Sequence, residues 1–227
     1  SLLGPCSVTV RRDIVLGPDK LQRMDLYLPS DPNRAAVVVI HGGAWHSGDK
    51  RRMAPACYIL ASHGYVAASV NYRLAPANHW PVQLRDCQLA VKWLRAHAAS
   101  LGINSARIGA LGSSAGGHLA AMMALADGPL AAGCKVKCAS DWYGPANLVR
   151  AAQTGPPSVV RLLVDFIGCR YSDCPDKYRE ASPVYQVTPN DPPIHICHGA
   201  KDTTVSADQS KELAAACHNK GVTHRLI

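Results

Sequence analysis

The chain has 227 residues, of which 48% are hydrophobic and 18% charged. This length and composition suit one well-packed α/β domain and exclude a disordered or low-complexity chain. The longest apolar runs, about eight residues, are far too short to cross a membrane.

The net charge of +8 does not by itself indicate a nucleic-acid partner. The basic residues are scattered, they cluster only at residues 11–12 and 50–52, and no stacking aromatic side chains are interleaved with them. We therefore interpret these clusters as solvated surface and predict no nucleic-acid partner and no membrane span. No internal repeat or linker interrupts the sequence, which predicts a single domain over residues 1–227.

The nine cysteines are a high and odd number. They form no Cys-x-x-Cys pair and lack matching histidines, so we predict no metal site. Cys169 and Cys174 either close a short local disulfide or are two of several buried free thiols. A disulfide favours export, so a secreted or periplasmic location is slightly favoured over a cytoplasmic one, and the start at Ser1 leaves the removal of a leader open.

The first strands of the chain follow two different patterns. Residues 8–16 and 22–28 alternate apolar and polar side chains, which predicts two antiparallel strands joined at residues 17–19. Residues 35–40 are continuously apolar, as expected of a strand covered on both faces. This strand leads directly into His-Gly-Gly-Ala-Trp at residues 41–45. Two glycines there let backbone N–H groups point into a cavity, as in half of an oxyanion hole; a tight turn around a buried tryptophan is the alternative.

Helices and strands then alternate along the chain. We predict a helix over residues 53–62, a strand over 65–70 and a helix from Pro81 to about Ser100. In that second helix Cys87, Ala90, Val91 and Leu94 form one apolar stripe. This order predicts a mostly parallel, doubly wound sheet with helices on both faces, in which ligands bind at the carboxyl ends of the strands.

Gly-Ser-Ser-Ala-Gly at residues 112–116 lies between an apolar run at 106–111 and a helical run at 119–126. A strand, a sharp turn flanked by glycines and a helix are the context of a nucleophile elbow. In this frame Ser114 is the nucleophile and Ser113 is not. The frame shifted by one residue, 113–117, begins with a serine in place of the first glycine. A turn that merely packs a helix on a strand is the alternative. The spacing fits neither a P-loop nor a dinucleotide fingerprint.

The second half of the chain is less regular. A strand is expected over residues 136–143, followed by a proline-rich excursion over the active-site face at 146–193 with one helical piece at 159–167. The buried strand at 194–197 leads to His-Gly-Ala-Lys-Asp, whose last residue, Asp202, lies just beyond a strand end. A helix over 206–220 and the start of a last strand at 223–227 complete the sequence.

These motifs together make the chain similar to the α/β-hydrolase serine esterases of the His-Gly-Gly-x-Trp type. That group includes the feruloyl and acetyl-xylan (carbohydrate) esterase and carboxylesterase branch and, more distantly, kynurenine formamidase. The matching segments occur in the same order, at residues 41–45, 71–76, 112–118, 181–183 and 198–202.

The resemblance implies a role for individual residues. Ser114 would be the nucleophile and Asp202 the triad acid. The N–H groups of Gly43, Ala44 and Ala115 would form the oxyanion hole, and Trp45 would line the substrate pocket. Such a mechanism needs no cofactor.

The catalytic histidine departs from this pattern, since the triad order in the fold is Ser, Asp, His. His218 and His224 come too early in the topology, and His198 precedes the acid, which favours a structural role. We therefore expect the base roughly ten to fifteen residues beyond Ile227, after a strand of about five or six residues, in a chain that continues past a truncated C-terminal end.

The expected activity is hydrolysis of carboxylic esters through an acyl-enzyme. Short acyl groups, or feruloyl and acetyl groups, on bulky alcohols such as sugars are the expected substrates of a fairly open cleft near Trp45 and Ser114. An aryl formamidase or a polyester-fragment hydrolase with the same machinery is one alternative. A non-catalytic binding protein with the α/β-hydrolase fold is an alternative of another class.

Overall fold

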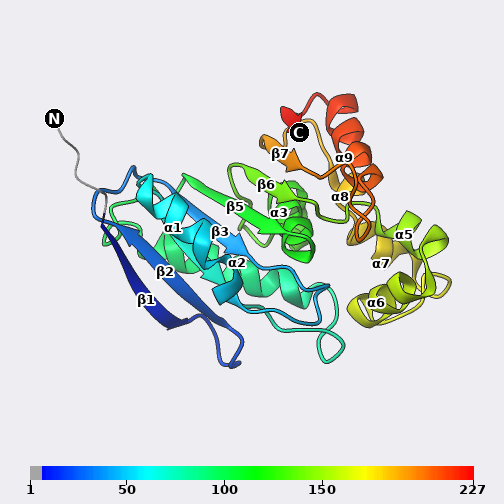
Figure 1. The fold of residues 1–227 in the computed structure, drawn as a ribbon, viewed down its shortest axis with the longest axis horizontal. Coiled ribbons are helices and arrows are strands. Elements are labelled where there is room, and N and C mark those ends of the chain that lie inside the picture. The colour runs from blue at the N-terminus through cyan, green and yellow to red at the C-terminus, as the bar shows by residue number, and fades with distance from the viewer. Residues whose placement is uncertain (1–6) are drawn as a thin grey trace.

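The computed structural model describes residues 7–227. Eight strands form one sheet in the order β1-β2-β4-β3-β5-β6-β7-β8 (Figure 1). Strand β2 pairs antiparallel with β1 and β4, and every other neighbouring pair is parallel. The strands are β1 (Val8–Val15), β2 (Arg23–Pro29), β3 (Ala36–Ile40), β4 (Val66–Val70), β5 (Ile108–Ser113), β6 (Ala139–Trp142), β7 (Ile194–Cys197) and β8 (His224–Leu226).

The predicted α/β-hydrolase fold, with helices on both faces of a mostly parallel sheet, is confirmed. Side chains alternate across β3: Val39 packs with the residues of α1 (Ala54–Ser62) on one face, and Val38 and Ile40 pack with α2 (Val82–Ala96) and α3 (Ala115–Leu125) on the other. Helix α9 (Asp208–Asn219) covers this second face further along, beside β7 and β8. A short 3-10 helix (Lys50–Met53) precedes α1.

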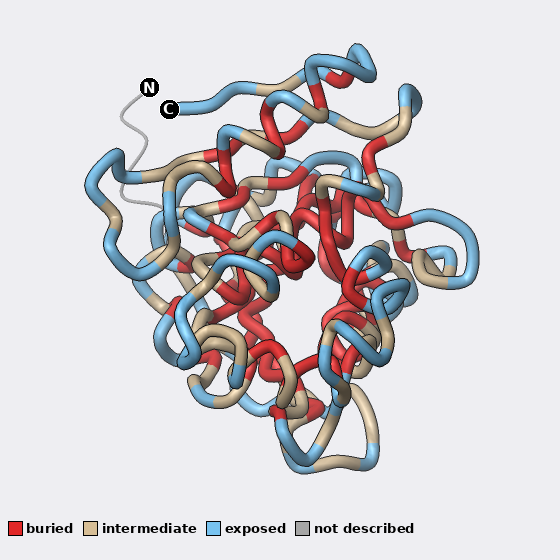
Figure 2. The backbone as a smooth tube through the Cα atoms, turned by 90° about the vertical axis from the view of Figure 1, so that its right-hand side faces the viewer, coloured by how far each residue is buried: buried red, intermediate tan, exposed pale blue. Residues whose placement is uncertain are grey.

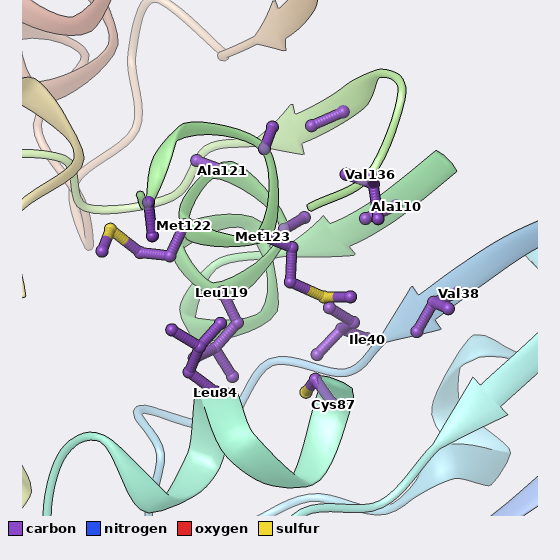
Figure 3. Close-up of a cluster of buried hydrophobic side chains, with 14 of the residues drawn as sticks. Val38, Ile40, Leu84, Cys87, Ala110, Leu119, Ala121, Met122, Met123 and Val136 are labelled. Atoms are coloured by element: carbon purple, nitrogen blue, oxygen red, sulfur yellow. The ribbon is translucent and has the colours of Figure 1, made fainter. Parts of the chain in front are cut away.

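Helix α3 lies in the core, and all eleven of its residues are buried. In Figure 3 Met123 points toward Ile40, Leu119 lies beside Leu84 of α2, and Cys87 of the same helix lies beside Ile40. In Figure 2 the buried chain runs through the middle of the molecule and the exposed chain through its outer loops. The helix that follows the predicted nucleophile is therefore held on all sides.

The predicted stripe on α2 is buried as expected, since Cys87, Ala90, Val91 and Leu94 have no exposed surface. The helix ends at Ala96 rather than near Ser100. Beyond it i→i−3 hydrogen bonds, from the N–H of Ala98 to Arg95 O and from that of Gly102 to Ala99 O, occur beside an i→i−4 bond from Leu101 to His97 O, so the helix unwinds through irregular turns. Such i→i−3 bonds are common where an α-helix ends.

The expectation of one helix between residues 146 and 193, a segment that we call the cap, is wrong. The cap holds α5 (Leu148–Thr154), α6 (Pro157–Ile167), α7 (Pro175–Glu180) and α8 (Pro183–Gln186). Three of these helices begin with a proline, whose fixed φ suits the first helical position, so prolines that suggested irregular chain are helix starts. In Figure 1 α5, α6 and α7 lie at the end of the molecule away from β1.

The connection between α6 and α7 and the segment after α3 add two features to the fold. Cys169 and Cys174 form a disulfide in the connection between α6 and α7, which settles the alternative left open by the sequence. A further short helix, α4 (Gly128–Ala131), follows α3. No helix among residues 7–227 is long and apolar enough to cross a membrane.

Candidate active site

Ser114 lies at the sharp turn between β5 and α3. Its φ of 53° and ψ of −121° are strained values for a residue with a side chain. Two backbone hydrogen bonds hold the turn: the Ser114 N–H donates to Trp142 O at 2.8 Å, and Ser114 O accepts from the His118 N–H at 3.0 Å. The neighbours of Ser114 on the sheet and on the helix thus fix the backbone from which its hydroxyl projects.

The glycines of the elbow are required by close packing. A Cβ atom on Gly112 would collide with the backbone carbonyl of Gly116, and a Cβ atom on Gly116 would collide with that of Ile40. A backbone carbonyl cannot move aside as the end of a flexible side chain can. Glycine is therefore the residue that lets α3 pass this close to β3 and β5.

The turn after β3 lies directly against the elbow. A Cβ atom on Gly42 would come within 2.8 Å of Ser113 O and 3.2 Å of Ser114 Cβ. The next residues, Ala44 and Trp45, have φ values of 51° and 62°, which non-glycine residues rarely adopt. We call residues 42–45 the oxyanion turn, because strain of this kind at the edge of a cavity marks a backbone held for a function.

Carbonyl contacts determine where the N–H groups of the oxyanion turn point. Gly43 O accepts hydrogen bonds from the N–H groups of His46 and Ser47, both at 3.0 Å, and Gly42 O accepts from His41 Nδ1 at 2.7 Å. In a trans peptide the N–H points opposite to the C=O. The N–H groups of Ala44 and Gly43 are therefore turned away from these contacts.

No protein acceptor within residues 7–227 takes the N–H groups of Gly43, Ala44 or Ala115. Ala115 is the first residue of α3, where a free N–H is expected and the helix dipole favours negative charge. Free donors on two adjoining segments are what an oxyanion hole requires.

Asp202 lies in the loop after β7. Its Oδ1 accepts from the N–H groups of Thr204 at 2.7 Å and Val205 at 3.0 Å. The Val205 hydrogen bond is the main reason why the pKa of Asp202 falls below its ordinary value, with Thr204 and the nearby His198 adding to the effect. The carboxylate is thus held ionised and in a fixed orientation, as a triad acid needs.

The buried ring of His198 contacts both the loop that holds Asp202 and helix α9. Its Nδ1 lies 2.6 Å from Ser210 Oγ and its Nε2 lies 2.9 Å from Val205 O, and the ring is 1% exposed. The second oxygen of Asp202 lies 3.5 Å from the same Nε2. With both nitrogens engaged inside the protein, His198 has the geometry of the structural residue that the sequence favours.

A cavity of about 620 Å³ opens over Ser114. It is bordered by four of the predicted site residues, Ala44, Trp45, Ser114 and Ala115. Gly43 and Asp202 do not border it, although the residues that follow Asp202 do. The remaining lining residues come from the cap, the loop after β7 and α9, among them Leu148, Val159, Leu162, Leu163, Thr203, Thr204, Ser206 and Gln209.

The structure does not bring a histidine to Ser114 among residues 7–227, since no imidazole there forms a hydrogen bond with Ser114 Oγ. His224 pairs with Ile194 at the amino end of β7, and His218 lies in the last turn of α9. Ser114 lies beyond the carboxyl end of β5 in the same parallel sheet. His224 therefore lies at the amino ends of the parallel strands, and the nucleophile lies at their carboxyl ends.

A buried acid, Asp141, lies beneath the elbow. It has no exposed surface, and its Oδ1 accepts from the Gly144 N–H at 2.8 Å. Its Oδ2 has no hydrogen-bond partner among the described residues. Burial raises the pKa of Asp141 to about 7, because the charged form is poorly solvated there.

Three supporting residues have no role that the sequence predicts. His41 directs the Gly42 carbonyl, His118 bonds Trp45, and Gln209 holds the start of the cap. The two histidines lie inside the quoted motifs, so their position is a usable signal. Gln209 contacts a segment 63 residues away, and no local pattern points to it. Within residues 7–227 no group of three His, Cys, Asp or Glu side chains could hold a metal ion.

The chain is similar in sequence and in fold to known esterases. The BD-FAE family model matches residues 24–217. Esterase LipQ of Mycobacterium tuberculosis is 33% identical over 225 residues, which cover 92% of this chain and 53% of LipQ. This chain spans about half the length of the curated relatives LipQ and LipC, 53% of each.

Two solved structures show the same arrangement of elements. A truncated form of a carbohydrate esterase from gut microbiota has a TM-score of 0.84 and 28% identity, over 98% of this chain and 87% of that one. Esterase 2 of Thermogutta terrifontis phosphonylated by sarin has a TM-score of 0.79 and 26% identity, over 98% of this chain and 82% of that one.

Proposed function

We propose that this chain, which belongs to the BD-FAE family, hydrolyses carboxylic esters with Ser114 as the nucleophile. The observation that carries the proposal is the meeting of Ser114 with free N–H groups of two segments, Ala44 after β3 and Ala115 in α3, at one cavity. This arrangement suits a reaction in which negative charge develops on a carbonyl oxygen next to an attacked carbon.

The proposed reaction has two halves. Ser114 Oγ attacks the ester carbonyl while a histidine takes its proton, and the N–H groups of Ala44, Ala115 and Gly43 stabilise the oxyanion. Collapse of this intermediate releases the alcohol, which takes the proton, and leaves an acyl group on Ser114. Water then attacks the acyl-enzyme and releases the acid. Asp202, ionised and held by two N–H groups, orients the histidine.

We further propose that the histidine is supplied by chain that follows β8. This strand lies beside β7, and the loop with Asp202 begins where β7 ends, so a loop at the carboxyl end of β8 would be its neighbour. Replacing each histidine encoded within roughly fifteen residues after Ile227 tests this, and His224→Ala and His218→Ala are the controls. Loss of turnover in either control would contradict the proposal.

The cavity favours short acyl groups on polar, bulky alcohols. One wall is apolar, from Leu148, Val159 and Leu163 of the cap, and the other is polar, from Thr203, Ser206 and Gln209. Its volume of about 620 Å³ suits a ligand of moderate size rather than an extended lipid chain. The likeness to a carbohydrate esterase from gut microbiota supports sugar esters as the substrate class.

Rates on p-nitrophenyl acetate, butyrate and laurate, together with release of acetate from acetylated xylo-oligosaccharides, test the substrate class. We expect the acetyl and butyryl esters to be turned over faster than the lauroyl ester. A preference for acyl chains of about twelve carbons or more would contradict the fit to this cavity.

Ser114→Ala tests the nucleophile itself. Removing the attacking hydroxyl should lower kcat by at least about 10³-fold with the fold intact, because a triad residue removed alone costs several orders of magnitude. Ser113→Ala is the matched control, since its hydroxyl contacts the Met53 sulfur at 3.7 Å and not the cavity. Retention of more than a few per cent of activity in Ser114→Ala would exclude this role.

A further inference from the structure

The imidazole of His118 connects three separate segments of the fold. It is fully buried, its Nδ1 accepts a hydrogen bond from Trp45 Nε1 at 3.2 Å, and its Nε2 donates to Ala181 O at 2.7 Å. Trp45 belongs to the oxyanion turn, His118 to the first turns of α3, and Ala181 to the end of α7 in the cap. One ring therefore bridges the two walls of the cavity.

The two partners of His118 determine its protonation state. An indole N–H can only donate and a carbonyl oxygen can only accept, so the neutral ring with its proton on Nε2 satisfies both. A second proton on Nδ1 would face the indole N–H. Burial lowers the pKa of His118 to about 4, which keeps the ring neutral near neutral pH. His118 is thus not placed to exchange protons during turnover.

The hydrogen bond to His118 fixes the position of the Trp45 indole, which its other contacts leave free to slide. Its backbone and that of Ala44 have φ values that persist only where the surroundings hold them. The indole stacks on the Phe166 ring with centroids 4.1 Å apart, and meets the His118 ring edge-on at 5.2 Å. Stacking lets a ring slide in its own plane, whereas the hydrogen bond to His118 Nδ1 fixes its position along that plane.

His118 is in turn fixed relative to the nucleophile. Its backbone N–H donates to Ser114 O at 3.0 Å, so the imidazole lies one helical turn beyond Ser114 on a wholly buried helix. We propose that His118 is a positioning residue that holds Trp45, and with it the N–H of Ala44, at a set place relative to Ser114. This proposal rests on the proposed function.

Two substitutions separate the two hydrogen bonds of His118. In His118→Asn the amide oxygen occupies the place of Nδ1, so the bond to Trp45 is kept and that to Ala181 is lost. In His118→Gln the amide nitrogen reaches the place of Nε2, so the bond to Ala181 is kept and that to Trp45 is lost. A histidine that only satisfies its hydrogen bonds in the core would make both variants less stable and leave kcat unchanged.

We expect His118→Gln to lower kcat about 10-fold to 100-fold with little change in KM, whereas His118→Asn stays within about 3-fold of the parent kcat. In a Trp45→Phe background, which keeps the stack on Phe166 but lacks the indole N–H, His118→Gln should cost no further kcat. Met122→Ala, buried in the same helix, controls for general loss of stability and should keep kcat.

A second measurement does not depend on activity. The indole N–H of Trp45, assigned by its loss in Trp45→Phe, should exchange slowly with solvent in the parent and in His118→Asn, and rapidly in His118→Gln. Equal kcat in the two His118 variants, or equal indole exchange, would overturn the positioning role. An inactive parent with the expected exchange pattern would instead refute the proposed function and, with it, any catalytic purpose of this contact.

Discussion

The two walls of the cavity are built in different ways. On the elbow side, Gly42, Gly112 and Gly116 bring backbone against backbone, and α3 is buried along its whole length. On the cap side, side chains hold the wall: Gln209 Oε1 accepts from the N–H groups of Ala146 at 2.8 Å and Asn147 at 2.6 Å. The first wall cannot shift without breaking the sheet, whereas the second depends on a few polar contacts that can be removed singly.

Asp202, in the loop after β7 and outside both walls, should show the largest loss of activity for a small structural change. Asp202→Asn keeps an oxygen for the N–H groups of Thr204 and Val205 but removes the negative charge, so kcat should fall by about 10²–10⁴-fold while the melting temperature changes little. Steady-state kinetics with a thermal melt measures both. A variant that keeps a tenth of the parent kcat would remove Asp202 from the triad.

The elbow wall should respond in the opposite way, with loss of stability as well as activity. Gly116→Ala places a methyl group against the Ile40 carbonyl, which should cost about 2–3 kcal/mol of unfolding free energy and shift Ser114. Gly199→Ala is the matched control, because nothing lies within 4 Å of its Cβ position. Denaturant unfolding compares the two, and an equally stable Gly116→Ala would contradict the tight approach.

Asp141 gives the elbow wall a pH-dependent stability. Because its pKa is about 7 in the fold and about 4 in the unfolded chain, the folded state binds more protons between these values. Its contribution is therefore fully present below about pH 4, is lost as the pH rises toward 7 and stays constant above, with a total on the order of a few kcal/mol. Asp141→Asn should flatten this dependence in unfolding curves from pH 5 to 8; an unchanged slope would assign it to other groups.

The cap wall should be displaced more easily than the elbow wall, because a single side chain holds its start. Gln209→Ala leaves the N–H groups of Ala146 and Asn147 without their acceptor, at a cost of about 1–3 kcal/mol. We expect KM to rise more than kcat falls, because the cap contributes the apolar lining and not the reacting groups. Lys211→Ala, on the exposed side of the same helix, is the control. A fall in kcat alone would show that the two walls are more closely coupled than their contacts indicate.

The same contrast explains what could be predicted from the sequence. The elbow and the oxyanion turn are local: Ser114, Ala115 and Ala44 belong to short glycine motifs whose geometry the chain dictates over a few residues. The helices of the cap are four to eleven residues long and three of them begin at prolines. Three of the four, α5, α7 and α8, are too short for an apolar period to identify them. The contacts of His118 with Trp45 and Ala181 span 73 and 63 residues, and only the folded chain brings them together.

The most direct test of Ser114 as the nucleophile is covalent labelling with a p-nitrophenyl alkylphosphonate, followed by mass spectrometry of the digested full-length protein. Esterase 2 of Thermogutta terrifontis, which has the same fold, has been captured phosphonylated by sarin. We predict one equivalent of p-nitrophenol released per chain, a single phosphonyl group on Ser114, and no label in Ser114→Ala. A label on Ser113 or elsewhere, or equal labelling of Ser114→Ala, would contradict the account.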